Sequence, residues 1–294
     1  GNANVTQALA KGTNYTLTGF IGTEGDHLAL AAATGTYTDK NAATDKAVTF
    51  GGLTLAGTGA GNYTLDKTTL TGIGTIAPRA LTLGAVAAQT KTYNGTTAAD
   101  ASKFRAVLNN VVAGEENLVK ATATGAAYND KNVAAANTVN YTGVQLAGAE
   151  AGNYTLAATT AQGAGTISRR ALTVATVAAQ SKTYDGNTAA DTSKFQATLG
   201  NLVTGEENSV TATATGAAYN DKNVAGANKV SYTGLALQGT GAGNYTIATT
   251  AEGAGSITAK QLNLALASGA RFDKTYDGNA NVTQALAKGT NYTL

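Results

Sequence analysis

The stretch Lys182-Thr183-Tyr184-Asp185-Gly186 recurs along the chain and opens each cycle of an internal repeat. It returns as KTYDG at 274–278 and as KTYNG at 91–95. Each cycle closes on Ala-Gly-Asn-Tyr-Thr, which begins at Ala60, Ala151 and Ala242, a constant spacing of 91 residues. Ordered motifs at one fixed spacing indicate a tandem array, and this spacing suits a small domain.

The repeats divide the chain into four parts. We assign a truncated repeat to 1–77, whole repeats to 78–168 and 169–258, and a partial repeat to 259–294. Residues 1–17 are identical to 278–294, so we expect a longer polypeptide with a three-domain super-repeat, of which this chain is a window. In that window the first repeat lacks its opening strand, and an unpaired strand lies around 261–277.

Composition excludes several classes of function. The net charge is +2 and only 13% of residues are charged, which argues against nucleic acid or an anionic membrane surface as a partner. No apolar run approaches the ~18 residues of a membrane span. The chain has no cysteine, so it has neither disulfides nor thiolate metal sites. We expect no cofactor and no metal.

The third repeat illustrates the expected secondary structure. Apolar and polar residues alternate with the period of a half-buried strand, and Gly-rich or Asn/Asp-rich turns separate these segments. We predict strands near 171–174, 195–199, 210–215, 230–237 (with a bulge at Gly234), 244–247 and 255–258. Several short strands without helices indicate an all-β fold, namely small antiparallel domains that are either Ig-like sandwiches or β-grasp-like.

The junctions between repeats contain no flexible linker. In Ile76-Ala77-Pro78-Arg79 the last strand of one unit leads almost directly into the first strand of the next. Short junctions restrict bending, so the sequence predicts domains stacked into an extended rod.

These motifs also carry a family resemblance. The set KTYDG, DKN, VxYxGLxL and AGNYT resembles the YDG and MBG-type repeats of large bacterial surface exoproteins, which are similar to filamentous-haemagglutinin-like adhesins exported by two-partner secretion. The departures are Asn94 in the second KTYxG and Thr38 before the first DKN. The resemblance implies an extracellular or outer-surface location on a Gram-negative bacterium, a stalk role and no catalytic residues.

Most recurring residues are interpreted as structural. We expect core tyrosines followed by tight turns in KTYxG, although these tyrosines could also stack on sugars, and we expect the Asn of GNYT to serve a turn. The predicted structural motif comprises Tyr93, Gly95, Tyr184, Asp185, Gly186, Tyr276, Asp277, Gly278, Asn62, Tyr63, Asn153, Tyr154, Asn244 and Tyr245. Asn62, Asn153 and Asn244 also stand in Asn-x-Thr, so they are candidate glycosylation acceptors.

The acidic residues are interpreted in the same way. Glu115-Glu116 and Glu206-Glu207 are expected to lie in solvated loop tips rather than to form an acid–base pair. Asp185 and Asp221 are expected to cap turns, because the spacing of a calcium loop is absent. His27 has no equivalent in later repeats, which excludes a shared His-based triad.

We therefore expect a non-enzymatic stalk of a secreted adhesin or biofilm-matrix protein, forming an extracellular rod or filament. The expected partners are other copies of the chain or extracellular polysaccharide. Two alternatives stay open. One is a carbohydrate-binding repeat array. The other is a self-assembling filament, in which the surplus strand of one chain completes the truncated repeat of another.

Overall fold

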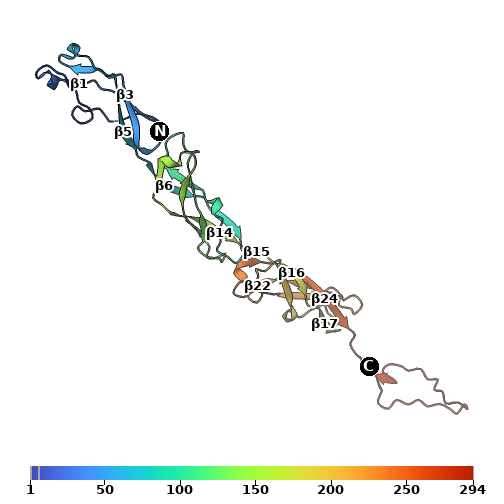
Figure 1. Cartoon of the computed structure of the whole chain (residues 1–294). Helices are drawn as coiled ribbons and strands as arrows, with labels where there is room; N and C mark the ends of the chain where they lie inside the picture. The colour runs from blue at the N-terminus through green and yellow to red at the C-terminus, as the bar shows by residue number, and fades with distance from the viewer. Residues whose placement is uncertain (1, 6, 294) are drawn as a thin grey trace. The chain divides into compact units, whose positions relative to one another are not determined.

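The structure is a computed structural model that describes residues 2–5 and 7–293. The chain divides into two compact units, Gly1–Ser168 and Arg169–Leu294 (Figure 1). The second unit begins where the sequence places the start of a repeat.

Both units consist of short strands and single 3-10 turns, which confirms the all-β prediction. The first repeat contains η1 (Glu24–His27), β1 (Leu28–Leu30), β2 (Gly35–Tyr37), β3 (Ala43–Gly51), β4 (Leu55–Gly57), η2 (Ala60–Asn62) and β5 (Thr69–Ile76). Strands β2, β3 and β5 form one sheet, in which β3 and β5 run beside one another (Figure 1).

The second repeat has a fuller set of strands. These are β6 (Arg79–Val86), β7 (Gln89–Thr92), η3 (Ala101–Lys103), β8 (Ala106–Asn109), β9 (Lys120–Thr122), β10 (Gly125–Tyr128), β11 (Thr138–Thr142), β12 (Gln145–Ala147), η4 (Ala151–Asn153), β13 (Tyr154–Leu156) and β14 (Thr160–Ser168). They pair as β10-β11-β14-β7, β13-β6-β8 and β12-β9. Two residues, Ala77 and Pro78, separate β5 from β6, as the sequence predicts.

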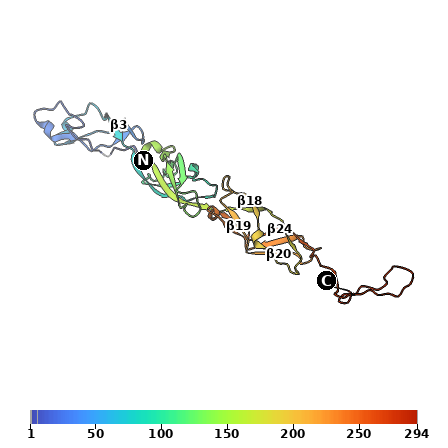
Figure 2. The ribbon, with the colours of Figure 1, turned by 90° about the horizontal axis from the view of Figure 1, so that it is seen from below.

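The third repeat, in the second unit, follows the same plan. It contains β15 (Arg170–Ala171), β16 (Thr173–Val177), β17 (Gln180–Thr183), η5 (Thr192–Lys194), β18 (Ala197–Gly200), β19 (Thr211–Thr213), β20 (Gly216–Tyr219), β21 (Lys229–Thr233), β22 (Ala236–Gln238), η6 (Ala242–Asn244), β23 (Tyr245–Thr246) and β24 (Thr250–Thr258). Its largest sheet has the order β17-β24-β21-β20. Figure 2 labels two strands of this sheet, β24 and β20. Among the described residues of the tail, 259–293, the only strands are β25 (Ala265–Leu266) and β26 (Tyr292–Thr293), which pair with each other.

The strand pairing differs from the expected antiparallel plan in one respect. The first strands of a whole repeat pair in parallel with its last strands: β7 with β14, β6 with β13, β17 with β24, and β15 with β23. All other strand pairs are antiparallel. Sequence periodicity indicates which residues face inward, but it does not indicate strand direction.

The predicted strand over 230–237 is interrupted rather than bulged. Gly234 has φ 63°, a left-handed conformation that an L side chain rarely adopts. The chain turns there, so that β21 pairs with β20 and β24, whereas β22 joins β19 in a separate sheet. The Gly that the sequence identified is therefore a strand end.

The core of the third repeat shows why these residues form strands. Val230 and Tyr232 alternate with polar neighbours on β21, and both are fully buried. Phe195 packs on Tyr232 with ring centroids 4.7 Å apart. Gln180 satisfies the buried hydroxyl of Tyr232 through its Nε2, at 3.2 Å. The second repeat builds the same contact from Phe104 and Tyr141, also at 4.7 Å.

Candidate functional site

The lysine of KTYDG organises the turn that follows it. The Lys182 Nζ donates to Asp185 Oδ1 at 2.8 Å and to the carbonyls of Asn187 and Ala189 at 2.9 and 3.0 Å. Asp185 also accepts from the Asn187 N–H, and Gly186 has φ 85°. The ammonium therefore holds the turn closed from its centre, a role that the sequence analysis did not assign to the lysine.

The other two copies of the turn repeat these contacts. Lys91 Nζ donates to Asn94 Oδ1 at 2.9 Å, and Lys274 Nζ donates to Asp277 Oδ1 at 2.8 Å. Gly95 and Gly278 both have φ 78°. The turn forms even in the tail, so its own residues are sufficient to shape it. The turn role predicted for the Asp or Asn and the Gly of this motif agrees with these contacts.

The lysine also contacts an aromatic ring in both whole repeats. Lys91 Nζ lies 5.0 Å from the ring centroid of Tyr128, and Lys182 Nζ lies 5.3 Å from that of Tyr219. These are cation–π distances. Burial lowers the pKa of Lys91, and the two tyrosine hydroxyls, which are buried, have raised pKa values for the same reason.

The tyrosines of KTYxG do not share one environment. Tyr93 is 1% exposed, as expected of a core residue, but Tyr184 is 38% exposed and Tyr276 is 92% exposed. The core interpretation is therefore wrong for Tyr184 and Tyr276. Tyr184 directly follows the end of β17, whereas Tyr276 lies in the tail, between β25 and β26 and in neither strand.

The tyrosine of AGNYT pairs with a glutamate in each repeat. Tyr154 OH donates to Glu115 Oε2 at 2.7 Å, and Tyr245 OH donates to Glu206 Oε2 at 2.7 Å. Tyr63 OH bonds Glu24 in the same way. The expectation that Glu115 and Glu206 are solvated is therefore wrong, because Glu115 is buried and Glu206 is half-buried. The second glutamate of each motif, Glu116 or Glu207, is exposed as expected.

Within the first unit, Glu115 belongs to a polar joint between the first and second repeats. Lys40 Nζ lies 2.9 Å from Glu115 Oε1 and 3.1 Å from Glu150 Oε1. We define the joint as the contacts of Lys40 with Glu115 and Glu150, together with the hydrogen bonds of Asn153 to residues 41, 42 and 150. The residue types of the ion pair recur every 91 residues, as Glu24, Glu115 and Glu206 and as Lys40, Lys131 and Lys222. That recurrence was the feature of the sequence from which a structural role for this glutamate and lysine could have been inferred.

Asn153 completes the joint. Its Oδ1 accepts from the Ala42 N–H at 2.8 Å, and its Nδ2 donates to Asn41 Oδ1 at 3.2 Å and to Glu150 Oε2 at 2.5 Å. Asn153 therefore binds the preceding repeat in addition to the turn role predicted for it. A side-chain amide that both donates and accepts fixes the approach of two segments more closely than an ion pair alone.

The electrostatics of the joint follow from these contacts. The Lys40 ammonium, with the Tyr154 hydroxyl, lowers the pKa of Glu115 to about 2. Glu115 and Glu150 raise the pKa of Lys40. Burial and the adjacent Glu115 carboxylate raise the pKa of Tyr154. Glu115 therefore stays ionised, Lys40 stays protonated and Tyr154 stays neutral across the neutral pH range, as the contacts of the joint require.

The aspartate of the DKN turn caps that turn. Asp39, Asp130 and Asp221 each accept from the backbone N–H two residues later, at 2.8, 2.6 and 2.7 Å. These are Asx turns, which agrees with the capping role predicted for Asp221. In the first repeat the nearly buried Lys46 also binds Asp39, with the Nζ at 2.5 Å from Oδ1.

The three candidate glycosylation acceptors differ in exposure. Asn62 is exposed, Asn153 is half-buried in the joint and Asn244 is 6% exposed. A glycan needs an accessible amide nitrogen. Asn62 therefore remains the most accessible candidate, and modification there stays a prediction.

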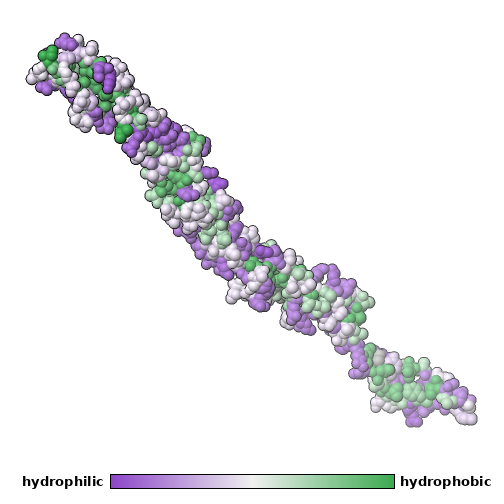
Figure 3. All heavy atoms as spheres, viewed as in Figure 1, coloured by the Kyte–Doolittle hydropathy of each residue, from purple (hydrophilic) through white to green (hydrophobic). Residues whose placement is uncertain are grey.

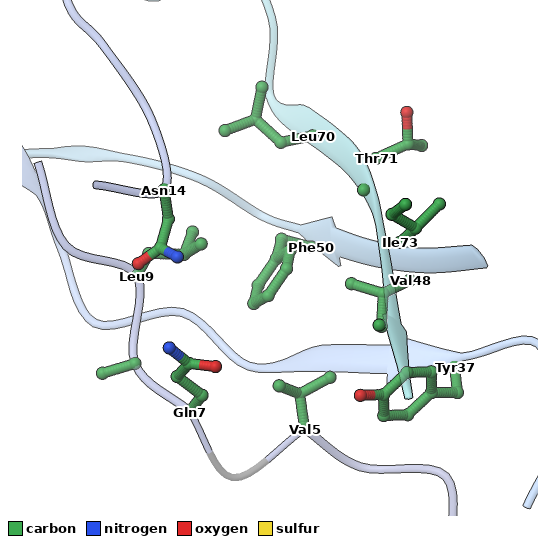
Figure 4. Close-up of a pocket in the computed structure, with 13 residues that line it drawn as sticks. Val5, Gln7, Leu9, Asn14, Tyr37, Val48, Phe50, Leu70, Thr71 and Ile73 are labelled. Atoms are coloured by element: carbon green, nitrogen blue, oxygen red, sulfur yellow. The ribbon is translucent and has the colours of Figure 1, made fainter. Parts of the chain in front are cut away.

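Over residues 2–5 and 7–293, no group of three or more His, Asp or Glu side chains is arranged to hold a metal ion. Within the same residues, no helix is long and apolar enough to cross a membrane. A hollow of about 190 Å³ lies in the first repeat, between the N-terminal segment and strands β3 and β5 (Figure 4).

Comparison with known proteins agrees with the repeat plan. The YDG domain matches three times in tandem, over residues 1–70, 77–161 and 168–252. No curated protein matched the sequence. The three matches cover most of the chain, and each ends within the first residues of the last long strand of a repeat, β5, β14 or β24. The chain therefore belongs to the YDG domain family, as a tandem array of three such repeats.

Proposed function

We propose that this chain is a non-enzymatic structural region of a secreted bacterial adhesin or biofilm-matrix protein. It acts as an extracellular stalk, rod or filament at the surface of a Gram-negative cell. The observation that carries the proposal is the joint between the first and second repeats, in which Lys40 and Asn153 bridge domains separated by only two linker residues. Such a joint suits a spacer, because it limits the angles that two domains can adopt.

The chemistry of the joint supports this role. Charged and amide groups interact specifically in water and make a joint that can form without a large apolar interface. The glutamate and the lysine of the joint recur at the repeat spacing, as expected of residues with the same structural role in each repeat of an array. A spacer role of this kind requires no catalytic group.

Small-angle scattering tests the stalk role. We expect the chain to give an extended particle, and we expect Lys40→Met to broaden the distribution of interatomic distances by loosening the joint. Lys67→Met is the control, because Lys67 is an exposed lysine of the same repeat. A compact particle, or identical curves for the wild type and both variants, would contradict the proposal. Protease shaving of intact producing cells, followed by detection of peptides from this chain, tests the surface location.

Polysaccharide is the alternative partner, and the exposure of Tyr184 favours testing it. Its ring is 38% exposed and adjoins Asp185, a pairing of aromatic face and hydrogen-bonding group that can bind a sugar. A glycan array with the wild type and Tyr184→Ala decides the question. Glycan binding that is lost in the variant would support the function of a carbohydrate-binding repeat array. If the wild type binds no glycan, the stalk role is the only function still proposed.

A further inference from the structure

The KTYNG turn of the second repeat contains the one Asn-Gly pair of the sequence, Asn94-Gly95. The KTYDG turns at 182–186 and 274–278 have an aspartate at the same position, Asp185 or Asp277. Asparagine is a thermolabile residue, because its side-chain amide can be lost as ammonia. Whether the amide is lost depends on the groups that surround it, and the turn places several such groups beside Asn94.

Three donors converge on the side-chain oxygen of Asn94. Lys91 Nζ lies 2.9 Å from Oδ1, Thr96 Oγ1 lies 3.1 Å from it and the Thr96 backbone nitrogen lies 3.2 Å from it. An ammonium and a backbone N–H can only donate, so the atom that they contact is the oxygen of the amide and not its nitrogen. Donors placed in this way stabilise the negative charge that develops on a carbonyl oxygen during nucleophilic attack.

The two nitrogen atoms that would take part in such an attack are not held by hydrogen bonds. Over residues 2–5 and 7–293, no hydrogen bond is donated by Asn94 Nδ2 or by the Gly95 N–H. Gly95 has φ 78° and no side chain, so no Cβ hinders the approach of its nitrogen to Asn94 Cγ. The turn therefore activates the carbonyl of the amide and leaves both the nucleophile and the leaving group free to move.

The turn is also open to water. Asn94 and Thr96 are exposed, and Gly95 is half-buried. Hydrophilic residues are spread over the surface of both units (Figure 3). Solvent hydroxide can therefore remove the proton of the Gly95 N–H, and water can reach the carbonyl carbons of Asn94.

We propose that Asn94 is a site of spontaneous deamidation, which its own turn accelerates. The Gly95 nitrogen loses its proton to hydroxide and attacks Asn94 Cγ, so that an N–Cγ bond closes a succinimide ring. The Cγ–Nδ2 bond breaks, and Nδ2 takes a proton from water and leaves as ammonia. A water molecule then opens the ring: attack on Cγ gives aspartate, and attack on the main-chain carbonyl carbon gives isoaspartate. Overall, water is consumed and ammonia is released, without oxidation or reduction.

The third repeat shows the contacts that an aspartate at position 94 would make. Lys182 Nζ and Asp185 Oδ1 form an ion pair at 2.8 Å, and the Asn187 N–H donates to the same oxygen at 3.2 Å. Deamidation would thus replace the contact of Lys91 with a neutral amide by an ion pair. The hydrogen bond from Lys182 lowers the pKa of Asp185. Since an ionised carboxylate resists nucleophilic attack, an aspartate held in this way would not readily cyclise again.

The chain also contains a matched asparagine that lacks the glycine. Asn187 Oδ1 accepts from Lys182 Nζ at 3.0 Å and from the Ala189 N–H at 2.8 Å, and Asn187 is exposed. The residue after it is Thr188, whose β-branched side chain crowds the nitrogen that would attack. Asn187 therefore has the lysine and the water but not the accessible nucleophile, and we expect it to stay an amide. This inference goes beyond the stalk role and does not depend on it.

Peptide mapping of the aged protein tests the site. The full-length chain is incubated at mildly alkaline pH, and mass spectrometry follows the conversion of amide to acid at Asn94 and at Asn187. Conversion at Asn94 should be faster by about tenfold or more, because only there can the nitrogen reach the side chain. The product at position 94 should contain both aspartate and isoaspartate, with the Asn94→Asp variant as the elution standard. Equal rates at the two asparagines, or aspartate without isoaspartate, would overturn the succinimide route.

Two further measurements test whether the turn accelerates the reaction. Lys91→Met removes the charged donor to Oδ1 and should slow conversion of Asn94 by about tenfold or more. Lys120→Met, at an exposed lysine of the same repeat, is the control and should leave the rate unchanged. The wild-type chain unfolded in urea keeps the Asn-Gly pair but loses the turn, so its Asn94 should convert more slowly than in the folded chain. Conversion that is as fast in urea, or in folded Lys91→Met, as in the folded wild type would overturn the proposal.

Discussion

Adding one methyl group at Gly253 should destabilise the third repeat. A Cβ there would lie 2.9 Å from Val177 Cγ1 and 3.1 Å from Val177 Cβ, inside ordinary van der Waals contact. Overpacking of this kind costs about 1–3 kcal/mol. Alanine also restricts the unfolded chain, which returns about 0.4–1 kcal/mol. We therefore expect Gly253→Ala to reduce the free energy of unfolding by up to about 2.6 kcal/mol, with a central value of ~1.3 kcal/mol.

The matched control is Gly72→Ala in the first repeat. Its Cβ would meet nothing within 4 Å, so only the unfolded-chain effect applies, and we expect stabilisation by up to about 1 kcal/mol. Calorimetry resolves such changes, since 1 kcal/mol shifts the Tm of a domain of this size by roughly 4–8 °C. Amide exchange on β24 assigns the shift to the third repeat. If both variants move the melting temperature in the same direction by the same amount, the argument from the packing around the added Cβ fails.

Three further changes have defined outcomes. The pKa of Glu115 is about 2 in the folded chain, against an ordinary value of 4.5. The ionised Glu115 therefore stabilises the folded state fully above pH 4.5, and this contribution is lost as the pH falls through about 2. Exchange of the Ala42 amide should quicken over that range, and Glu115→Gln should remove the dependence. Lys182→Met removes the charged hydrogen bonds that close the turn of KTYDG. The free energy of unfolding, measured with urea, should fall by about 1–3 kcal/mol. Leu172→Ala, at a buried site, should cost about 2–5 kcal/mol, whereas Leu262→Ala should change the stability of the isolated chain by less than about 0.5 kcal/mol.

Much of the fold could be predicted because its signals are local. Alternation places Val230 and Tyr232 on the buried face of one strand, and the Asp-Gly of KTYDG forms the turn that this pair predicts. The repeat spacing predicted a tandem array, and the family comparison found three YDG repeats in tandem. These features depend on neighbours in the sequence, so they can be read from the sequence alone.

The remaining features depend on contacts between distant residues. Glu115 was expected in a solvated tip, but Lys40 and Tyr154 reach it from 75 and 39 residues away. Strand direction could not be inferred either, since a parallel and an antiparallel partner of β14 require the same alternation. The burial of Tyr93 and the exposure of Tyr276 show that one motif can occupy opposite environments when its surroundings differ.

The parallel pairing of β17 with β24 has a consequence for a repeat under tension. These strands lie near the entry and the exit of the repeat, and four residue pairs face one another along them. When the two ends are pulled apart, β17 is drawn toward its N-terminal end and β24 toward its C-terminal end. The hydrogen bonds between the two strands are then loaded in shear, so they must break together instead of one after another. Each whole repeat therefore contains a pair of parallel strands that resists stretching along the chain.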